Sequence, residues 1–217
     1  MKATRIVIFA KAPVAGLVKT RLIPALGAEQ ATQLARRMLL HTLQQAQAAG
    51  IGPVELCVTP GPSDPAWANL PPVNGVAWTA QPEGDLGVRM AGAAERALGS
   101  SEHVLLIGTD CLELDAARLQ HAARLLGHSD AVLYPTFDGG YALLGLRRFD
   151  PRPFERMPWS TTEVAARTIA CFRTLGWRLS VSSALHDIDE PADLCWLPGD
   201  WRIDLQPTSS PEIGLPS

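Results

Sequence analysis

Short runs of β-branched and aliphatic residues alternate with longer segments of helical periodicity along most of the chain. This alternation constrains the fold more than any other feature, because it is typical of an α/β domain with a mainly parallel central sheet. Two of the runs are separated by only five residues, which is short enough for a hairpin, so the sheet is predicted to be mixed. We expect strands at residues 4–10, 54–59, 76–80, 103–108, 131–135, 141–146 and 178–182, and helices at 28–49, 86–98 and 115–127.

Residues 160–163 read Ser-Thr-Thr-Glu, which is the S-x-x-E pattern of a capping box at the start of a helix. We therefore predict a further helix that starts there and runs to about residue 175. The chain shows no internal repeat and no linker, so one domain is expected over residues 1–197. Residues 198–217 are rich in Pro and Ser and are expected to form a C-terminal tail, draped on the surface or partly disordered.

The composition of the 217 residues is that of an ordinary globular protein, with 47% hydrophobic and 19% charged residues. No apolar run is long enough for a membrane span and no signal-peptide pattern follows Met1, so a soluble cytoplasmic protein is expected. The net charge of −3 argues against nucleic-acid and membrane partners. The four cysteines lie far apart without a C-x-x-C pair, which favours reduced thiols over a zinc site or a disulfide framework.

The first 28 residues contain five basic side chains and no acid, so a local anion site is expected inside an acidic protein. Residues 11–22 follow the first strand, and ligands of open α/β sheets bind in such loops. They do not form a Walker loop, because Val18 and not Gly precedes Lys19, and the chain has no G-x-G-x-x-G motif. Lys19 and Arg21 are predicted on one side of an extended segment, where they could bind phosphates, although a solvated basic loop is equally compatible with the pattern.

Acidic residues follow three other strands. Asp110 ends the most strongly buried strand, where a carboxylate fits a hard metal ion, and a helix N-cap is the alternative. Asp187 and Asp189 should point the same way while Ile188 faces the core, so one of them could complete a metal site with Asp110, with helix capping again as the competitor. Asp138 precedes two glycines, and hairpin geometry alone would explain that turn.

Six motifs in this order resemble a bacterial family of GT-A-fold transferases that is commonly labelled glycosyltransferase and is sometimes tied to arsenosugar or selenium-associated gene neighbourhoods. The resemblance covers about residues 5–197, and residues 13–21 are also similar to that part of 2-phospholactate guanylyltransferase. The motifs are Lys-x-Pro-x5-Lys-Thr-Arg-Leu from residue 11, Gln-x-x-Gly-Asp-Leu-Gly-x-Arg-Met from 81, Gly-Thr-Asp at 108–110, Asp-Gly-Gly-Tyr at 138–141, Trp-Ser-Thr at 159–161 and Asp-Ile-Asp at 187–189.

This resemblance implies a nucleotide-diphospho-sugar transferase (GT-A) fold, with Mg²⁺ or Mn²⁺ held by Asp110 and Asp189. The implied nucleotide-binding residues are Lys11, Pro13, Gly16, Lys19, Arg21, Gln81, Gly84, Asp85, Leu86, Gly87 and Thr109. The implied acceptor-binding residues are Asp138, Gly139, Gly140, Tyr141, Trp159, Ser160 and Thr161. The chain departs from the family at Leu112, where Pro is usual, and at Ala142, where a second aromatic residue is usual, and the latter change could alter acceptor choice.

Two reactions are compatible with these residues. In nucleotidyl transfer an acceptor attacks the α-phosphorus of a nucleoside triphosphate and pyrophosphate leaves, so cations must neutralise the developing charge. In glycosyl transfer the acceptor attacks the sugar carbon of a nucleotide sugar. Lys19 and Arg21, and a single Asp110 preceded by Gly-Thr, favour nucleotidyl transfer to a small acceptor that could itself be phosphorylated. The family's usual label favours glycosyl transfer.

The expected catalytic residues are Lys19, Arg21, Asp110 and Asp138, with Asp138 as the general base if the acceptor is a hydroxyl. A nucleotide-binding protein without catalysis is a weaker alternative. A Cys111 nucleophile is weaker still, because that residue has no basic neighbour in the sequence. The nucleotide base, the acceptor and a homo-oligomeric state stay open.

Overall fold

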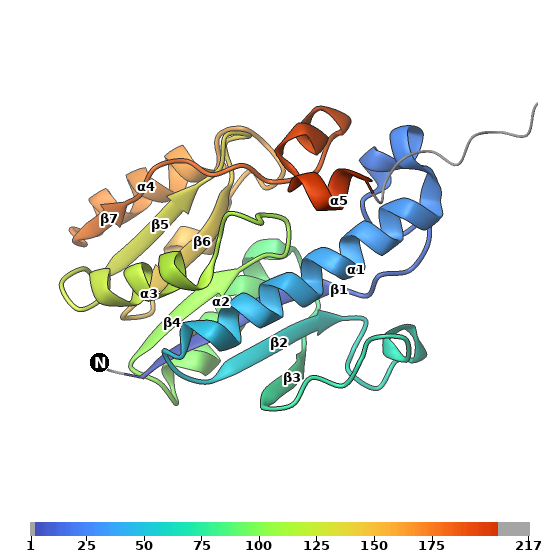
Figure 1. Cartoon of the computed structure of the whole chain (residues 1–217). Coiled ribbons are helices and arrows are strands. Elements are labelled where there is room, and N and C mark those ends of the chain that lie inside the picture. Colours follow the sequence, from blue (N-terminus) through green and yellow to red (C-terminus); the bar gives the residue numbers. More distant parts are fainter. Residues whose placement is uncertain (1–2, 204–217) are drawn as a thin grey trace, which may run out of the picture.

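A computed structural model describes residues 3–203, and its seven strands form one sheet in the order β3-β2-β1-β4-β6-β5-β7 (Figure 1). β6 is antiparallel to its neighbours β4 and β5, and the other strand pairs are parallel. The predicted α/β fold with a mixed, mostly parallel sheet is therefore confirmed. The strands are β1 (Thr4–Lys11), β2 (Val54–Thr59), β3 (Val76–Ala80), β4 (His103–Ile107), β5 (Ala131–Pro135), β6 (Tyr141–Leu146) and β7 (Leu179–Val181).

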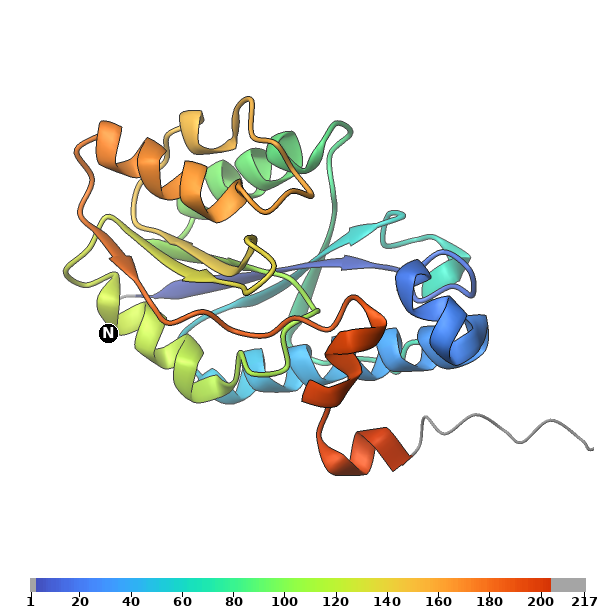
Figure 2. The same cartoon turned by 90° about the horizontal axis from the view of Figure 1, so that it is seen from above.

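Helices cover both faces of the sheet, with α1 and α3 on one face and α2 and α4 on the other (Figure 2). Because successive residues of a strand point to opposite faces, Ile6 and Ile8 pack toward α1 and α3, whereas Val7 packs toward α2 and α4. All three are fully buried, as in any parallel strand that is covered on both sides. The helices are α1 (Ile23–Ala49), α2 (Leu86–Leu98), α3 (Ala116–Leu125), α4 (Val164–Thr174) and α5 (Gly199–Ile203), and the 3-10 helices are η1 (Thr20–Leu22), η2 (Pro65–Trp67), η3 (Arg152–Phe154) and η4 (Pro191–Trp196).

Two local predictions are wrong, although most element boundaries agree with the structure within two residues. The segment that holds Lys19 and Arg21 is not extended, because Lys19 has a left-handed backbone (φ 47°) and η1 follows it directly. Ser160 does not start a capping box, because its φ is also positive (63°), whereas an N-cap residue needs an extended backbone. Glu163 takes the N-cap position of α4 and makes no side-chain cap.

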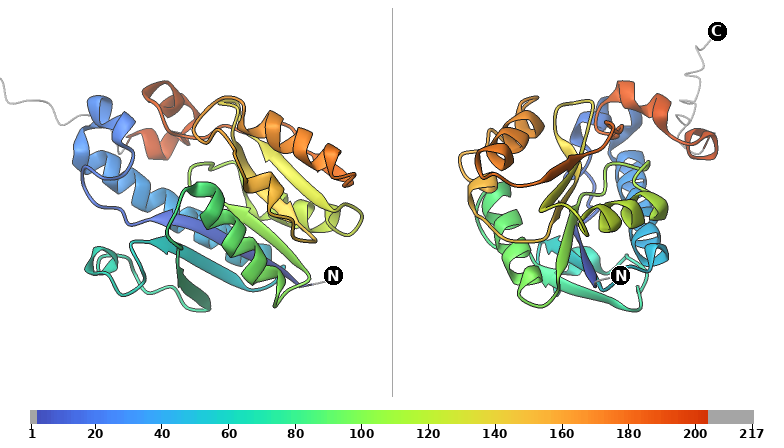
Figure 3. Two further views of the ribbon diagram at one scale, coloured as in Figure 1. Left: turned by 180° about the vertical axis from the view of Figure 1, so that it is seen from behind. Right: turned by 90° about the vertical axis from the view of Figure 1, so that its left-hand side faces the viewer.

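The chain after β7 returns across the carboxyl end of β4 and packs against the first half of α1 (Figures 1 and 3). The Ile188 amide donates to the Asp110 carbonyl oxygen (2.8 Å), and Ile188 is buried together with Met38 of α1. Trp201 of α5 is buried in the same cluster, within the segment predicted to be a tail. The domain boundary at residue 197 stays a prediction, and residues 204–217 lie outside the described residues.

Among the helices that the structure describes, none has the length and apolar character that a membrane span requires.

Candidate functional site

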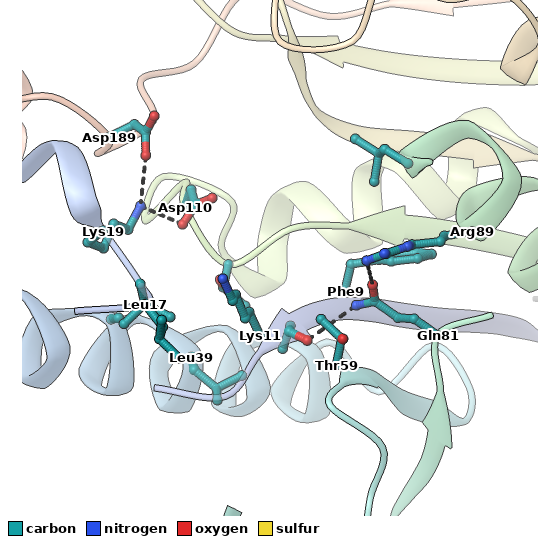
Figure 4. A pocket seen from close by; sticks show the side chains of 15 residues that line it. Phe9, Lys11, Leu17, Lys19, Leu39, Thr59, Gln81, Arg89, Asp110 and Asp189 are labelled. Carbon is teal, nitrogen blue, oxygen red and sulfur yellow. Dashed lines mark hydrogen bonds and ion pairs between the residues drawn. The ribbon is translucent and has the colours of Figure 1, made fainter. Parts of the chain in front are cut away.

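A cavity of about 350 Å³ lies at the carboxyl ends of β1, β2 and β4 (Figure 4). Its wall includes Lys11 at the end of β1, Thr59 at the end of β2, and Thr109 and Asp110 directly after β4. The chain passes from β1 to β2 on one side, while β4 pairs with the other side of β1, so the strand order reverses here. Ligands of open α/β sheets bind at such a switch point, and the volume is sufficient for a small organic molecule.

The ammonium group of Lys19 lies between two carboxylates in the wall of this cavity (Figure 4). Lys19 Nζ is 2.5 Å from Asp110 Oδ1 and 3.9 Å from Asp189 Oδ1, and it donates a hydrogen bond to the Ile188 carbonyl oxygen. The Lys19 side chain is only 5% exposed, whereas Asp110 and Asp189 are 54% and 39% exposed. The two acids therefore meet at one positive charge, and that charge is the lysine that was expected to contact phosphates.

Arg21 holds Asp189 from the solvent side. Arg21 Nη1 is 2.8 Å from Asp189 Oδ2 and 3.7 Å from Glu190 Oε1. Neither metal-ligand candidate caps a helix, because Asp115 is the N-cap of α3 and Glu190 is the N-cap of η4. The capping alternatives that the sequence left open for Asp110 and Asp189 are thus not realised.

The oxygen atoms around Lys19 are suited to a divalent cation. They come from two carboxylates and one backbone carbonyl, which are the donors that Mg²⁺ and Mn²⁺ prefer. Within residues 3–203, no group of three or more His, Cys, Asp or Glu side chains is arranged to hold a metal ion. Mg²⁺ commonly binds to one or two carboxylates and completes its shell with substrate phosphates, so Asp110 and Asp189 fit a metal ion that binds together with a nucleotide.

Asp187 lies in the same acidic region but has a different environment from Asp189. Its side chain is half-buried, and burial raises its pKa to about 6, with further contributions from the negative charges of Asp138, Asp193 and Asp110. Ile188 between the two acids is 1% exposed, as alternation along the strand-like segment predicts. Of the two acids, Asp189 is the one that contacts Lys19 in the described part of the chain.

The loop predicted to bind the nucleotide is only partly in the cavity wall. Gln81 and Leu86 line the cavity, but the Gln81 amide is occupied, because it donates to the carbonyl oxygens of Ala10 and Cys57. The Asp85 carboxylate is the N-cap of α2 and accepts a hydrogen bond from the Val88 amide (2.9 Å). These contacts give Gln81 and Asp85 structural roles that the sequence motif did not reveal.

The glycines of that loop, and Pro13 and Gly16 of the basic loop at residues 11–22, do not line the cavity. A Cβ atom on Gly87 would lie 2.2 Å from the Phe154 carbonyl oxygen, so this position accepts no side chain without a shift. Gly84 and Gly16 both have positive φ values (122° and 79°), which L side chains rarely adopt. Within the described residues, Pro13, Gly16, Gly84, Asp85 and Gly87 lie outside the cavity wall.

The first predicted acceptor motif contacts the backbone that directly follows the second, at Thr162 and Ala165. The Gly139 carbonyl oxygen accepts a hydrogen bond from the Ala165 amide (2.8 Å), and a Cβ on Gly139 would lie 2.2 Å from the Thr162 carbonyl oxygen. Asp138 Oδ1 closes the β5–β6 turn, because it accepts hydrogen bonds from the Gly140 amide (2.8 Å) and from Thr136 Oγ1 (2.5 Å). The hairpin explanation of the Asp-Gly-Gly sequence is therefore realised, and Asp138 itself stays exposed.

Among the other members of those motifs, Tyr141 and Trp159 pack at the hydrophobic core, whereas Ser160 and Thr161 lie at the surface. Burial raises the pKa of Tyr141, whose hydroxyl lies 3.8 Å from Met90 Sδ, and Trp159 packs against the same hydrophobic cluster. Ser160 and Thr161 are exposed, and Thr161 Oγ1 donates to the Pro158 carbonyl oxygen (2.7 Å).

Sequence reasoning gave no role to two other features of the site. Arg89 lines the cavity from α2 and donates to Gln81 Oε1 (3.2 Å). Its position in the same sequence motif as Gln81, eight residues later, could have indicated that it belongs to the site. Leu17 also lines the cavity and is 57% exposed. The Cys111 nucleophile is disfavoured, because burial raises the pKa of this thiol to about 12.

The family model described as "Uncharacterized protein conserved in bacteria (DUF2064)" matches residues 42–161. Comparison with curated proteins gives no match. Among solved structures, the chain is similar to a candidate nucleotide-diphospho-sugar transferase from Desulfovibrio desulfuricans G20, with 32% sequence identity, a TM-score of 0.82, and coverage of 89% of this chain and 85% of that chain.

Two more distant structures share the fold. One is a cytidylyltransferase from Leptospira borgpetersenii serovar Hardjo-bovis (strain JB197), with 16% identity, a TM-score of 0.57, and coverage of 94% of this chain and 92% of that chain. The other is a 4-diphosphocytidyl-2C-methyl-D-erythritol synthase from Anaerococcus prevotii DSM 20548, with 12% identity, a TM-score of 0.57, and coverage of 94% and 99%. These similarities confirm the predicted nucleotide-diphospho-sugar transferase type of fold.

Proposed function

Because the chain belongs to the bacterial family DUF2064, whose description names no reaction, we propose from the site itself that it is a metal-dependent nucleotidyltransferase. It would transfer a nucleotidyl group from a nucleoside triphosphate to a small acceptor and release pyrophosphate. The observation that carries this proposal is the meeting of Lys19, Asp110 and Asp189 at the switch point of the sheet. The shared fold with cytidylyltransferases supports it.

The proposed roles follow from the charges in the cavity wall. Lys11 and Lys19 in the wall, and Arg21 outside the wall beside Asp189, would contact the triphosphate, because cations there stabilise the negative charge that develops on the leaving pyrophosphate. Asp110 and Asp189 would hold Mg²⁺ or Mn²⁺, which supplies additional neutralisation of the phosphates. Lys19 would leave these two acids and turn to the phosphates when the nucleotide binds.

The acceptor would approach from the side of Asp138, beyond the carboxyl end of β5 and the amino end of β6. For a hydroxyl acceptor, the exposed carboxylate of Asp138 is the proposed general base, and its turn hydrogen bonds fix its position. An acceptor that is already an anionic oxygen nucleophile would not require this base.

A second candidate function is glycosyl transfer from a nucleotide-diphospho-sugar. The specific observation in its favour is the similarity to the candidate nucleotide-diphospho-sugar transferase from Desulfovibrio desulfuricans G20 at 32% identity over most of both chains. The two functions differ in the donor and in the leaving group, which is pyrophosphate in the first and a nucleoside diphosphate in the second.

Thermal-shift measurements with the four nucleoside triphosphates and with nucleotide sugars, each with and without Mg²⁺, test the proposal directly. We expect a triphosphate to stabilise the protein only in the presence of Mg²⁺, and Asp110→Asn to abolish that stabilisation. Pyrophosphate release on addition of candidate acceptors would then report the reaction. Stabilisation by a nucleotide sugar and by none of the triphosphates would replace nucleotidyl transfer with glycosyl transfer.

A further inference from the structure

Three aromatic rings from distant parts of the chain form a stack beside the proposed acceptor side of the site. The ring of His186 is the middle one. Its centroid lies 4.3 Å from that of Phe137 at an interplanar angle of 28°, and 3.7 Å from that of Trp196 at 21°. We refer to Phe137, His186 and Trp196 as the aromatic stack.

Hydrogen bonds hold two members of the stack in place, and the stack adjoins the acidic residues Asp138 and Asp187. His186 Nδ1 lies 2.7 Å from Glu113 Oε1, and the Phe137 amide donates to the Leu185 carbonyl oxygen (3.1 Å). Asp138 follows Phe137 directly and Asp187 follows His186 directly, and the negative charge of Asp138 contributes to the raised pKa of Asp187. The stack therefore borders the region where an acceptor would approach.

Both outer rings are unusually exposed. Phe137 is 67% exposed and Trp196 is 55% exposed, although large aromatic side chains normally gain stability from burial. Contacts with His186 account only for the inner faces of the two rings. Since the loop is already held by the Asp138 turn and by the Leu185 bridge, holding the loop in place does not explain why the outer aromatic faces are left to solvent.

The charges beside the stack determine what these faces can bind. Glu113, Asp138 and Asp187 are all acidic, and the nearby guanidinium of Arg118 is engaged by Asp115 and by the Glu113 carbonyl oxygen. A phosphorylated acceptor would meet like charges here, whereas an ammonium group would be attracted both by the carboxylates and by the electron-rich ring faces.

We infer that the aromatic stack is an acceptor-binding platform and that the acceptor is a cation, with an amine or a quaternary ammonium group placed over Phe137 or Trp196. This inference rests on the proposed function, because it names the acceptor of the same transfer. In this arrangement Lys11, Lys19 and Arg21 bind only the phosphates of the donor nucleotide. Phe137, His186 and Trp196 determine which acceptor binds.

Choline and its neutral isostere 3,3-dimethylbutan-1-ol are suitable probes, with glycerol 3-phosphate as the anionic probe. Binding of each to the full-length protein can be measured by saturation-transfer NMR of the probe protons. We expect choline to bind at least threefold more tightly than the neutral isostere and to exceed the phosphate ester. Phe137→Leu and Trp196→Leu should each weaken choline binding by about two- to fivefold, the size of one exposed cation–π contact.

Val181→Ala is the matched control, because Val181 is also a large exposed apolar side chain (47%) but lies on the edge strand β7. Equal affinity for choline and its isostere, preference for glycerol 3-phosphate, or unchanged choline binding in both leucine variants would each overturn the inference. The triphosphate thermal shift is measured in parallel. If choline binds but no nucleotide does, the aromatic stack is a cation-binding site and the proposed nucleotidyl transfer is wrong. If a triphosphate binds but choline does not, the proposed function stands and the inference about the acceptor is wrong.

Discussion

Replacement of Lys19 by Met should make the protein bind a divalent cation more tightly in the absence of nucleotide. In the wild-type structure the Lys19 ammonium occupies the oxygen atoms of Asp110 and Asp189 that a metal ion would use. Methionine has a similar length but no charge, so Lys19→Met removes the ammonium from Asp110 and Asp189, leaves the Arg21 contact of Asp189 in place, and largely preserves the packing of a side chain that is 5% exposed.

The size of the effect follows from the distances and the exposure. Two unit charges 4 Å apart near a protein surface attract by about 4 kcal/mol, and exposed partners reduce the net value to about 1 kcal/mol. Asp110 is in contact at 2.5 Å and Asp189 is at 3.9 Å, but they are 54% and 39% exposed, so we assign to Lys19 a net competition of about 1.5–2 kcal/mol. This corresponds to a roughly 10- to 30-fold gain in metal affinity.

Free Mn²⁺ can be counted by electron paramagnetic resonance during a titration without nucleotide. Lys19→Met should bind Mn²⁺ about 10- to 30-fold more tightly than the wild type. Without metal it should unfold about 3–6 °C lower, because Asp110 loses its ion pair and Asp189 keeps only the one with Arg21, and Mn²⁺ should reverse this loss.

Arg21→Met is the graded control, since Arg21 is 59% exposed and contacts Asp189 but not Asp110 in the structure, so its gain should be no more than about threefold. Asp110→Asn combined with Lys19→Met should lose the Mn²⁺ site. If Lys19→Met binds Mn²⁺ no more tightly than the wild type, the argument that lysine and metal compete for the same oxygen atoms is refuted.

Three further predictions concern the surrounding structure. The pKa of Asp187 is raised to about 6 in the folded protein, so the folded state binds more protons than the unfolded state and its stability falls as the pH rises from about 4 to 6. Asp187→Asn should therefore raise the melting temperature by about 2–4 °C at pH 8 and by much less at pH 4. An equal shift at both pH values would contradict this reasoning. Glu55 is 3% exposed and pairs with two arginines near the start of β2, so Glu55→Ala should lower the urea-unfolding free energy by about 3 kcal/mol without changing triphosphate affinity. Gly139→Ala should lose about 2–4 kcal/mol in the same measurement, because its Cβ would clash with Thr162, whereas Gly176→Ala, with a positive φ but open space, should lose only about 1 kcal/mol.

The fold could be predicted from the sequence because its signals are local and repeated. β4 is a continuous apolar run because the strand is buried on both faces, and α1 has a 3.6-residue apolar period because one side of the helix packs on the sheet. In each element several neighbouring residues therefore indicate the same secondary structure. The hairpin of β5 and β6 follows from the short Asp-Gly-Gly loop between them. The convergence of Asp110 and Asp189 could also be anticipated, because both follow strands that end at the same side of the sheet.

The details of the site could not be predicted, because they depend on partners that are distant in the sequence. Lys19 adopts a left-handed backbone, which local preference disfavours, while its ammonium contacts Ile188 and two acids far along the chain. Gln81 and Asp85 carry a motif that the resemblance assigns to a nucleotide, yet their side chains hydrogen-bond the backbone. The stacking of His186 between two rings required knowledge of where η4 packs, and no sequence period marks that position.

Lys19 and Ile188 are 169 positions apart, and Arg21 and Asp189 are 168 apart, so the earliest and latest parts of the described chain complete the site together. At a synthesis rate of about 5–20 residues per second, the basic loop emerges roughly 10–30 s before its acidic partners are made. The nascent chain can form the first parallel strands during that interval but not the cation site. The contacts of Lys19 and Arg21 can therefore form only after residue 189 has been synthesised, and a product that stops before residue 189 would keep much of the sheet while lacking the proposed metal-binding centre.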